Sequence, residues 1–174
     1  MLFKKGSAAA TLLLTLLLLL SGCSASPDAA QLLAYQQYPL RAEVCYTRCG
    51  RSAAGTLQLD SPDSSSFTFR EPQTLEGLTI SRCGEEYAIL FGNGTSIPCP
   101  AAGDLPDLHL LTALFSLSPE ELRAFSVSED ASQSAAIFMT EFGELRVLFT
   151  GDSSFPSAIE APDIYLYADL RPTA

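Results

Sequence analysis

The feature that most constrains the fold of this chain is a period-two alternation of apolar and polar residues from residue 40 onward. It is clearest in residues 40–47, where leucine, alanine, valine and tyrosine alternate with polar residues or cysteine. Successive side chains of a β-strand point to opposite faces, so this alternation predicts a half-buried strand. Similar runs separated by turn signals, such as residues 92–94 and 141–143, predict about nine short antiparallel strands.

Two segments depart from this alternation and favour helices. Ser26-Pro27-Asp28 combines a capping serine, a proline at the first helical position and an acid in the first turn, so we expect a short helix to about residue 37. Residues 105–117 carry large apolar side chains at helical spacing, which predicts a second, strongly apolar helix. Residues 151–162 are predicted to form a turn-rich connection. The expected fold class is α+β: one strongly curved antiparallel sheet, a half-barrel, with short helices packed on its concave face.

The first 23 residues have the three-part organisation of a bacterial export signal. Lys4 and Lys5 precede an uncharged apolar run, and small residues precede Cys23. This ending resembles the lipobox of bacterial lipoproteins. The resemblance implies removal of residues 1–22, palmitate-type acyl chains on Cys23, and a lipid anchor at the extracytoplasmic face of the cell membrane. Residues 23–30 would then be a spacer and residues 31–174 a single domain. The alternative is an uncleaved membrane anchor, for which the apolar run has about the minimum length.

The charge of the expected mature chain restricts its partners. Both lysines lie in the segment predicted to be removed, which leaves eight arginines against twenty acids and a net charge of −12. A field of that sign repels nucleic acid and anionic membrane surfaces, so nucleic-acid binding is excluded.

Four cysteines follow Cys23, and an even number in an exported domain favours disulfides. Cys45 and Cys49 are expected on one strand about 13 Å apart, too far to pair with each other. If both bridges form, each of these two must therefore reach Cys83 or Cys99. Free thiols and a zinc site are the alternatives, although the spacing is poor for zinc.

The order of elements supports a family resemblance. A lipobox, a short helix, an opening strand at residues 38–44, a meander that includes residues 74–80 and an apolar mid-chain helix resemble the LolA/LolB-type lipoprotein carriers and related small lipoproteins. In that family the sheet and its helices enclose an apolar cavity that takes acyl chains. The candidate cavity walls here are large apolar side chains of the helix and the strands: Leu108, Leu111, Leu114, Phe115, Phe67, Phe69 and Phe91.

Residues suited to catalysis are few. His109 is the single histidine, and no nucleophile–base pattern or phosphate-binding glycine loop accompanies it. Paired acids such as Glu85-Glu86 and Glu120-Glu121 are expected on solvated faces or at a helix start. We therefore expect neither an enzyme nor a cofactor or metal site. Two hypotheses remain: an anchored lipoprotein that binds a lipid or other hydrophobic ligand, or an envelope interaction protein with a filled core that binds another envelope protein.

Overall fold

The computed structural model describes residues 28–99, 106–113, 115–130 and 132–173. The predicted export signal, Cys23, Ser26 and Leu114 lie outside these ranges. The described residues form one antiparallel sheet in the order β6-β5-β4-β3-β2-β1-β11-β10-β9-β8-β7, and its two edge strands do not pair with each other. Its eleven strands are β1 (Leu40–Arg48), β2 (Arg51–Ser61), β3 (Ser64–Glu71), β4 (Thr79–Cys83), β5 (Glu86–Leu90), β6 (Ser96–Cys99), β7 (Leu122–Val127), β8 (Gln133–Thr140), β9 (Gly143–Thr150), β10 (Ala158–Ala161) and β11 (Leu166–Pro172).

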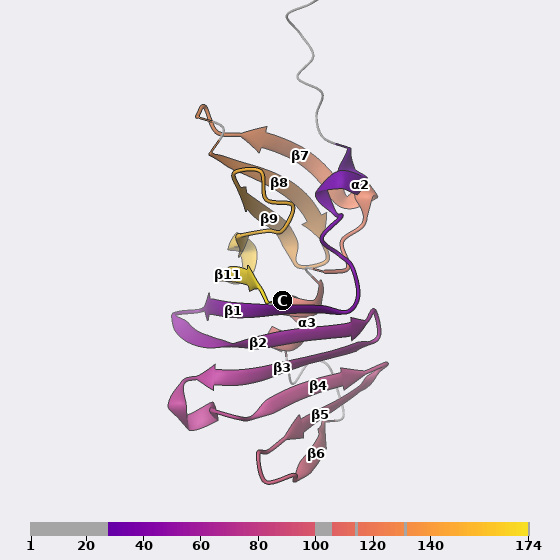
Figure 1. Ribbon diagram of the computed structural model, residues 1–174, viewed down its shortest axis with the longest axis vertical. Helices are drawn as coiled ribbons and strands as arrows, with labels where there is room; N and C mark the ends of the chain where they lie inside the picture. Colours follow the sequence, from indigo (N-terminus) through magenta and orange to yellow (C-terminus); the bar gives the residue numbers. More distant parts are fainter. Residues whose placement is uncertain (1–27, 100–105, 114, 131, 174) are drawn as a thin grey trace, which may run out of the picture.

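The sheet consists of two meanders joined at its centre. Figure 1 shows β1 to β6 stacked in chain order, with β7, β8 and β9 above them. The join is the pairing of β1 with β11, in which Val44 lies opposite Leu170. The single antiparallel sheet expected from the alternation is therefore confirmed, with two strands more than the sequence indicates.

One face of the sheet carries the core, and we call it the inner face. Along β1, Ala42, Val44 and Tyr46 are buried, whereas Arg41, Cys45 and Thr47 on the opposite face are exposed. The strongest alternation in the sequence thus marks a strand with one wet and one dry face. The buried cluster continues through the inner-face residues of β2, β3, β9 and β11.

The apolar mid-chain helix is part of this core. Helix α3 (Pro106–Ala113) contacts β3 and lies behind β1 and β2 in Figure 1. Leu108, Leu110 and Leu111 are each 1–2% exposed. Neighbouring helical positions point in different directions, so burial of all three means that the helix is surrounded by apolar groups rather than laid on a surface. Phe115 and Leu117, which follow the helix, are buried as well.

The N-terminal helix is shorter than expected and has a different cap. Helix α2 (Ala29–Leu32) ends well before residue 37, and the Asp28 carboxylate accepts a hydrogen bond from the Ala30 amide at 3.3 Å. Asp28 therefore occupies the capping position that the sequence assigned to Ser26. Beyond the helix the Tyr35 ring packs against Phe115, with centroids 5.8 Å apart, because burial of this ring in the core outweighs continuation of the helix.

Strand β10 corrects the expectation that residues 151–162 form only a turn-rich connection. All four of its residues pair with β11, and the first three also pair with β9. Pro156 and Pro162 flank the strand, and such prolines give a segment the composition of a turn region. Ile159 and Ala161 are fully buried all the same, so tertiary pairing overrides the local signal.

The predicted disulfides are not present, and the four cysteines in the described ranges are free thiols. Cys45 on β1 and Cys83 on β4 are three strands apart, which corresponds to about 14 Å at the usual strand spacing. Disulfides require Cα atoms within about 7 Å. Cys49 lies in the β1–β2 turn, whereas Cys83 pairs with Glu86 and Cys99 with Tyr87, toward the other end of these strands.

Candidate functional site

Strand β2 extends beyond the end of its neighbour β3, which leaves a notch at the edge of the hairpin. β1 pairs with β2 down to Arg48 opposite Arg51, but β3 pairs with β2 only from Ala54 onward. Proline lacks the amide hydrogen that a strand ladder needs, so Pro72 ends β3 and the chain turns into a 3₁₀ helix, η1 (Gln73–Leu75). The first three residues of β2 therefore have a strand neighbour on one side only.

A pocket of about 590 Å³ occupies this notch. We call it the hairpin-end pocket, because the β1–β2 hairpin forms one of its sides. Its volume lies within the range of about 300–1,000 Å³ found for small-molecule sites. The described residues that line it are Tyr46, Arg48, Cys49, Arg51, Ser52, Ala53, Phe69, Pro72 and Leu75.

The apolar wall of the pocket continues the core. Phe69 and Phe67 meet edge to face with ring centroids 4.9 Å apart, and Tyr46 lies 5.9 Å from Phe67. Gly55 makes this packing possible, since a Cβ at that position would lie 2.7 Å from Cζ of Phe67 and closer still to the Thr68 carbonyl oxygen. The pocket is thus bounded by aromatic rings whose positions are set by close packing.

Two arginines supply the charge of the pocket. Arg48 is half-buried and Arg51 is exposed, and the two are direct cross-strand partners. Tyr46 and Ala53, two residues further into the strands, belong to the core or pack against it, so strand alternation places both arginines on the inner face. Among the residues that the structure describes, the lining includes no aspartate or glutamate. The described lining is therefore apolar toward the core and carries two arginines at the hairpin side.

A second pocket, of about 390 Å³, adjoins the first at Tyr46, Ser52, Ala53 and Pro72 but has the opposite charge. Its lining includes Glu71 and Asp169, and the Tyr167 hydroxyl donates to Oδ1 of Asp169 at 2.8 Å. This hydrogen bond to the carboxylate is the main cause that raises the pKa of Tyr167. The polar, acidic lining suits an apolar ligand less well than the hairpin-end pocket does.

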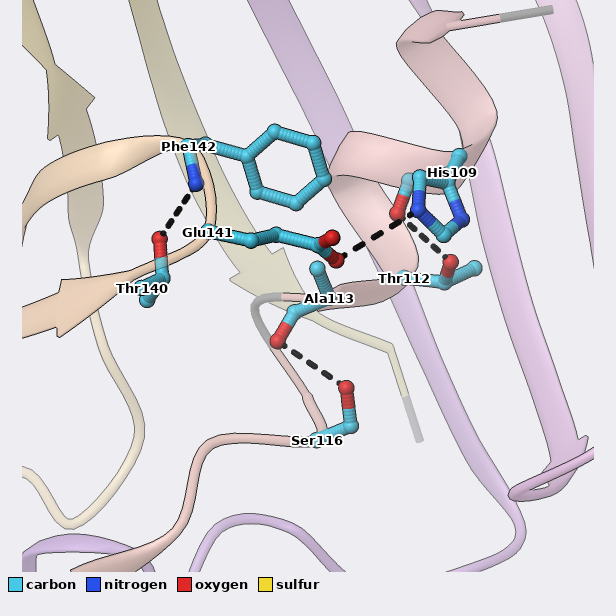
Figure 2. A network of polar contacts seen from close by, with 7 residues as sticks. All are labelled: His109, Thr112, Ala113, Ser116, Thr140, Glu141 and Phe142. Carbon is cyan, nitrogen blue, oxygen red and sulfur yellow. Dashed lines mark hydrogen bonds and ion pairs between the residues drawn. The ribbon is translucent and has the colours of Figure 1, made fainter. Parts of the chain in front are cut away.

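His109 takes part in a structural contact between α3 and the β8–β9 turn. Figure 2 shows Glu141 reaching from that turn toward His109, with the Phe142 ring beside it. Nε2 of His109 lies 3.7 Å from Oε1 of Glu141, and the His109 and Phe142 rings meet edge to face at 5.5 Å. The Thr112 hydroxyl donates to the His109 carbonyl oxygen at 2.8 Å. These contacts fix the position of α3 and bring no nucleophile to the imidazole.

The structure places the expected cavity residues in three different environments. Phe69 lines the hairpin-end pocket. Phe67, Leu108, Leu111 and Phe115 are at most 2% exposed within the core, Phe91 is 39% exposed beyond the end of β5, and Leu114 lies outside the described residues.

Apart from Phe69, the sequence reasoning missed the residues that border the pocket. Arg48-Cys49-Gly50-Arg51 carries the signal that was available, because residues on either side of a two-residue turn face each other across a hairpin. Within the described ranges, no three histidine, cysteine, aspartate or glutamate side chains converge on a metal site. No helix in those ranges is both long and apolar enough to span a bilayer.

Comparison with known proteins identifies remote structural similarity. No protein-family model matches the chain, and no curated protein matches its sequence. An uncharacterised conserved protein from Thermus thermophilus is similar in structure, with 12% identity, a TM-score of 0.48, and coverage of 87% of this chain and 88% of that chain.

A LolA superfamily protein from Nitrosomonas europaea matches with 8% identity and a TM-score of 0.40, over 86% of this chain and 93% of that chain. A domain from Vibrio parahaemolyticus, provisionally assigned to outer membrane lipoprotein sorting, matches with 10% identity and a TM-score of 0.38, over 84% and 89%. These neighbours are of the kind that the sequence resembles. Since the TM-scores lie below 0.5, the function proposed below rests on the residues of this chain.

Proposed function

We propose that the chain is a non-catalytic lipoprotein, anchored through Cys23 at the extracytoplasmic face of a bacterial membrane, that binds a lipid or other hydrophobic ligand in the hairpin-end pocket. The observation that carries the ligand-binding part is the pocket itself: about 590 Å³ bordered by Tyr46, Phe69 and Leu75 at the open end of the core. Apolar walls beside a few polar groups are typical of sites for small amphiphilic molecules.

The proposed location of the ligand differs from the sequence hypothesis. The large apolar side chains of α3 are buried in the core of the described fold. A ligand therefore enters where β3 stops at Pro72, and Phe69 is the wall residue that the two sites share.

The anchoring part of the proposal is supported by residues 1–23 alone. A basic start, an apolar run and a cysteine behind small residues are the features that an acylated export signal requires. Mass spectrometry of the N-terminal peptide from the membrane fraction tests it. A diacylglyceryl group on Cys23 supports the anchor, and an intact residue 1–22 segment contradicts it.

Fluorescence of an introduced tryptophan tests ligand binding, because the chain contains none of its own. The core side chains lie between Leu32 and Leu170, so residues 24–174 retain the whole described core. Leu75→Trp places the reporter in the pocket wall. We expect its emission to shift to shorter wavelength when laurate or 1-dodecanol is added below the micellar concentration. Val127→Trp on β7, where the native side chain is 55% exposed, is the matched control and should not respond.

The binding proposal fails if Leu75→Trp shows no saturable change with either amphiphile. Equal responses from Leu75→Trp and Val127→Trp also contradict it, because they indicate adsorption over the whole surface.

A second function is favoured by a different observation. Leu90, Phe91 and Ile97 on the β5–β6 hairpin are 38–49% exposed at one edge of the sheet. Exposed apolar side chains at a sheet edge fit an interaction protein of the cell envelope. This second function is favoured if the native chain pulls down an envelope protein and Ile97→Asp abolishes that binding. The Leu75→Trp fluorescence should then show no response to either amphiphile.

A further inference from the structure

We propose that the second pocket binds one residue of a neutral saccharide, which stacks on the Tyr167 ring and donates hydrogen bonds to Asp169 and Glu71. We call this pocket the outer-face pocket, because its side chains lie mainly on the face of the sheet opposite the core. The inference goes beyond the proposed function and does not depend on it, since these three residues line the outer-face pocket and not the hairpin-end pocket.

Strand alternation places four side chains of the outer-face pocket next to one another. Cys45 and Thr47 are the exposed positions on either side of a buried residue of β1, and Tyr167 and Asp169 are in the same relation on β11. Thr47 lies opposite Tyr167, and Cys45 lies opposite Asp169. These side chains therefore stand together on two paired strands and face away from the core. A ligand reaches them without displacing a core side chain.

A register shift of the β-bulge kind brings a carboxylate from β3 to the same face. Gly55 on β2 pairs with Phe69, but the adjacent Ala54 pairs with Glu71, so β3 has one extra residue at this point. Ala54 belongs to the outer face because its partner on β1 is an exposed position. In a regular ladder Arg70 would lie opposite Ala54. Bulges redirect side chains next to binding sites, and this one sets an acid at the pocket in place of an arginine.

Tyr167 offers an aromatic surface to the solvent. Its side chain is 41% exposed, and its hydroxyl donates to Oδ1 of Asp169 at 2.8 Å, which restrains the ring on the sheet. The face of an aromatic ring is electron-rich, and the polarised C–H groups on one face of a pyranose pack against such a surface. The ring can therefore serve as a platform for the apolar face of a sugar.

The polar groups beside the ring match the hydroxyl edge of a sugar. The carboxylates of Asp169 and Glu71 accept hydrogen bonds, and bonds to ionised acceptors are stronger than those between neutral groups. The hydroxyl oxygens of Thr47 and Ser52 lie 2.9 Å apart, and each can donate as well as accept. A sugar edge also donates and accepts. An ammonium ion only donates, so this lining favours a saccharide over an organic cation.

Charge and size restrict the saccharide further. The carboxylates of the pocket and the net charge of −12 from Cys23 onward repel uronic acids and sugar phosphates, which leaves neutral sugars. The volume of about 390 Å³ lies within the range for small-molecule sites. The pocket thus suits a single sugar residue, either free or as part of a longer chain.

Saturation-transfer NMR followed by calorimetric titration of residues 24–174 tests the inference. The neutral probes are maltotriose, mannotriose, galactotriose and chitotriose. Trigalacturonate is the anionic probe, and choline is the cationic one. We expect at least one neutral trisaccharide to bind saturably, and at least about tenfold more tightly than trigalacturonate or choline.

Variants locate the bound sugar. Tyr167→Ala removes the platform and should weaken binding of the preferred trisaccharide about tenfold, whereas Tyr167→Phe keeps the ring and should cost at most about threefold. Glu71→Gln replaces a charged acceptor with a neutral one and should weaken binding about threefold to tenfold. Tyr165→Ala is the matched control, because this tyrosine is 76% exposed two residues away and lines neither pocket described above.

The outcomes separate this inference from the proposed function. The inference is overturned if no neutral trisaccharide binds saturably, or if choline or trigalacturonate binds as tightly as the best of them. Equal losses in Tyr165→Ala and Tyr167→Ala also overturn it, because the sugar then adsorbs to any exposed ring. The response of Leu75→Trp to laurate should be the same with and without Tyr167→Ala. Failure of saccharide binding therefore leaves the proposed function intact, and failure of the fluorescence test leaves this inference intact.

Discussion

Substitution of Gly55 by alanine tests the packing that forms the aromatic wall of the pocket. The residue lies on β2 opposite Phe69, and its backbone conformation is one that alanine can adopt. The obstacle is space, because the new Cβ would lie 2.7 Å from Cζ of Phe67, whose side chain is 2% exposed, and closer still to a backbone carbonyl of β3. The ring is enclosed and the carbonyl belongs to a strand ladder, so neither moves freely.

Two opposing effects determine the size of the change. Overpacking of a close-packed core typically costs about 1–3 kcal/mol. Replacing glycine by alanine within a strand recovers about 0.5–1 kcal/mol of backbone entropy. The expected net loss of stability is therefore about 1–2 kcal/mol, which corresponds to a decrease of about 0.5–1 M in the urea midpoint for an m-value near 2 kcal/mol/M.

Equilibrium urea unfolding followed by far-ultraviolet circular dichroism measures this loss. Gly92→Ala is the matched control, since a Cβ at that exposed position meets no atom within 4 Å. It should leave stability unchanged or slightly higher. Phe67→Leu removes the obstructing ring, so the cost of Gly55→Ala should shrink in that background by more than about 0.5 kcal/mol. A Gly55→Ala protein as stable as the native chain would refute the reasoning.

Three further predictions concern caps and titrating groups. The Glu121 carboxylate accepts a hydrogen bond from the Ser118 amide at 2.8 Å, so Glu121→Ala should lower stability by about 1 kcal/mol in urea unfolding, whereas the same change at the preceding, exposed glutamate should have little effect. Several hydrogen bonds, of which the one from Ser128 is the largest cause, lower the pKa of Asp130 to about 2. The stability that the ionised Asp130 contributes is therefore present above about pH 4 and is lost as the pH falls toward 2. Carboxyl NMR titration should show a higher pKa for Asp130 in Ser128→Ala. Burial raises the pKa of Tyr35, so its contribution is complete below about pH 10 and is lost as the pH rises further; tyrosinate absorbance should show the Tyr35→Phe variant lacking the last-titrating phenol.

The strands could be predicted from the sequence wherever one face of the strand is exposed to solvent and the other is buried in the core. The alternation from Leu40 to Thr47 encodes directly which side chains of β1 enter the core. Strand β10 could not be found in this way, because three of its four residues are buried and no alternation results. The disulfide expectation failed for a related reason: cysteine count and spacing say nothing of strand order, and strand order separates Cys45 from Cys83 by three strands.

The candidate site depends on where strands end, which a sequence pattern indicates poorly. Leucines and phenylalanines such as Leu108 and Phe115 were expected to line a cavity, and the structure buries both side chains in the core. The space arises instead from unequal strand lengths, since β2 begins at Arg51 while its pairing with β3 begins at Ala54. Pro72 indicated the end of β3, and Arg48 and Arg51 flank a visible turn. That Pro72 lies beside Arg48 and Arg51 in one pocket follows only from the register of β1, β2 and β3.

The pairing of β1 with β11 determines how the chain completes its fold. It sets Ala42 against Pro172, residues from the two ends of the described chain, in the middle of the sheet. The hairpins on either side are local and form early, whereas this central seam closes a loop that spans almost the whole domain, a slow step in folding. Each half before that moment exposes one additional unpaired edge, at β1 and at β11. The sheet therefore stays divided into two halves until β11 is available to pair with β1.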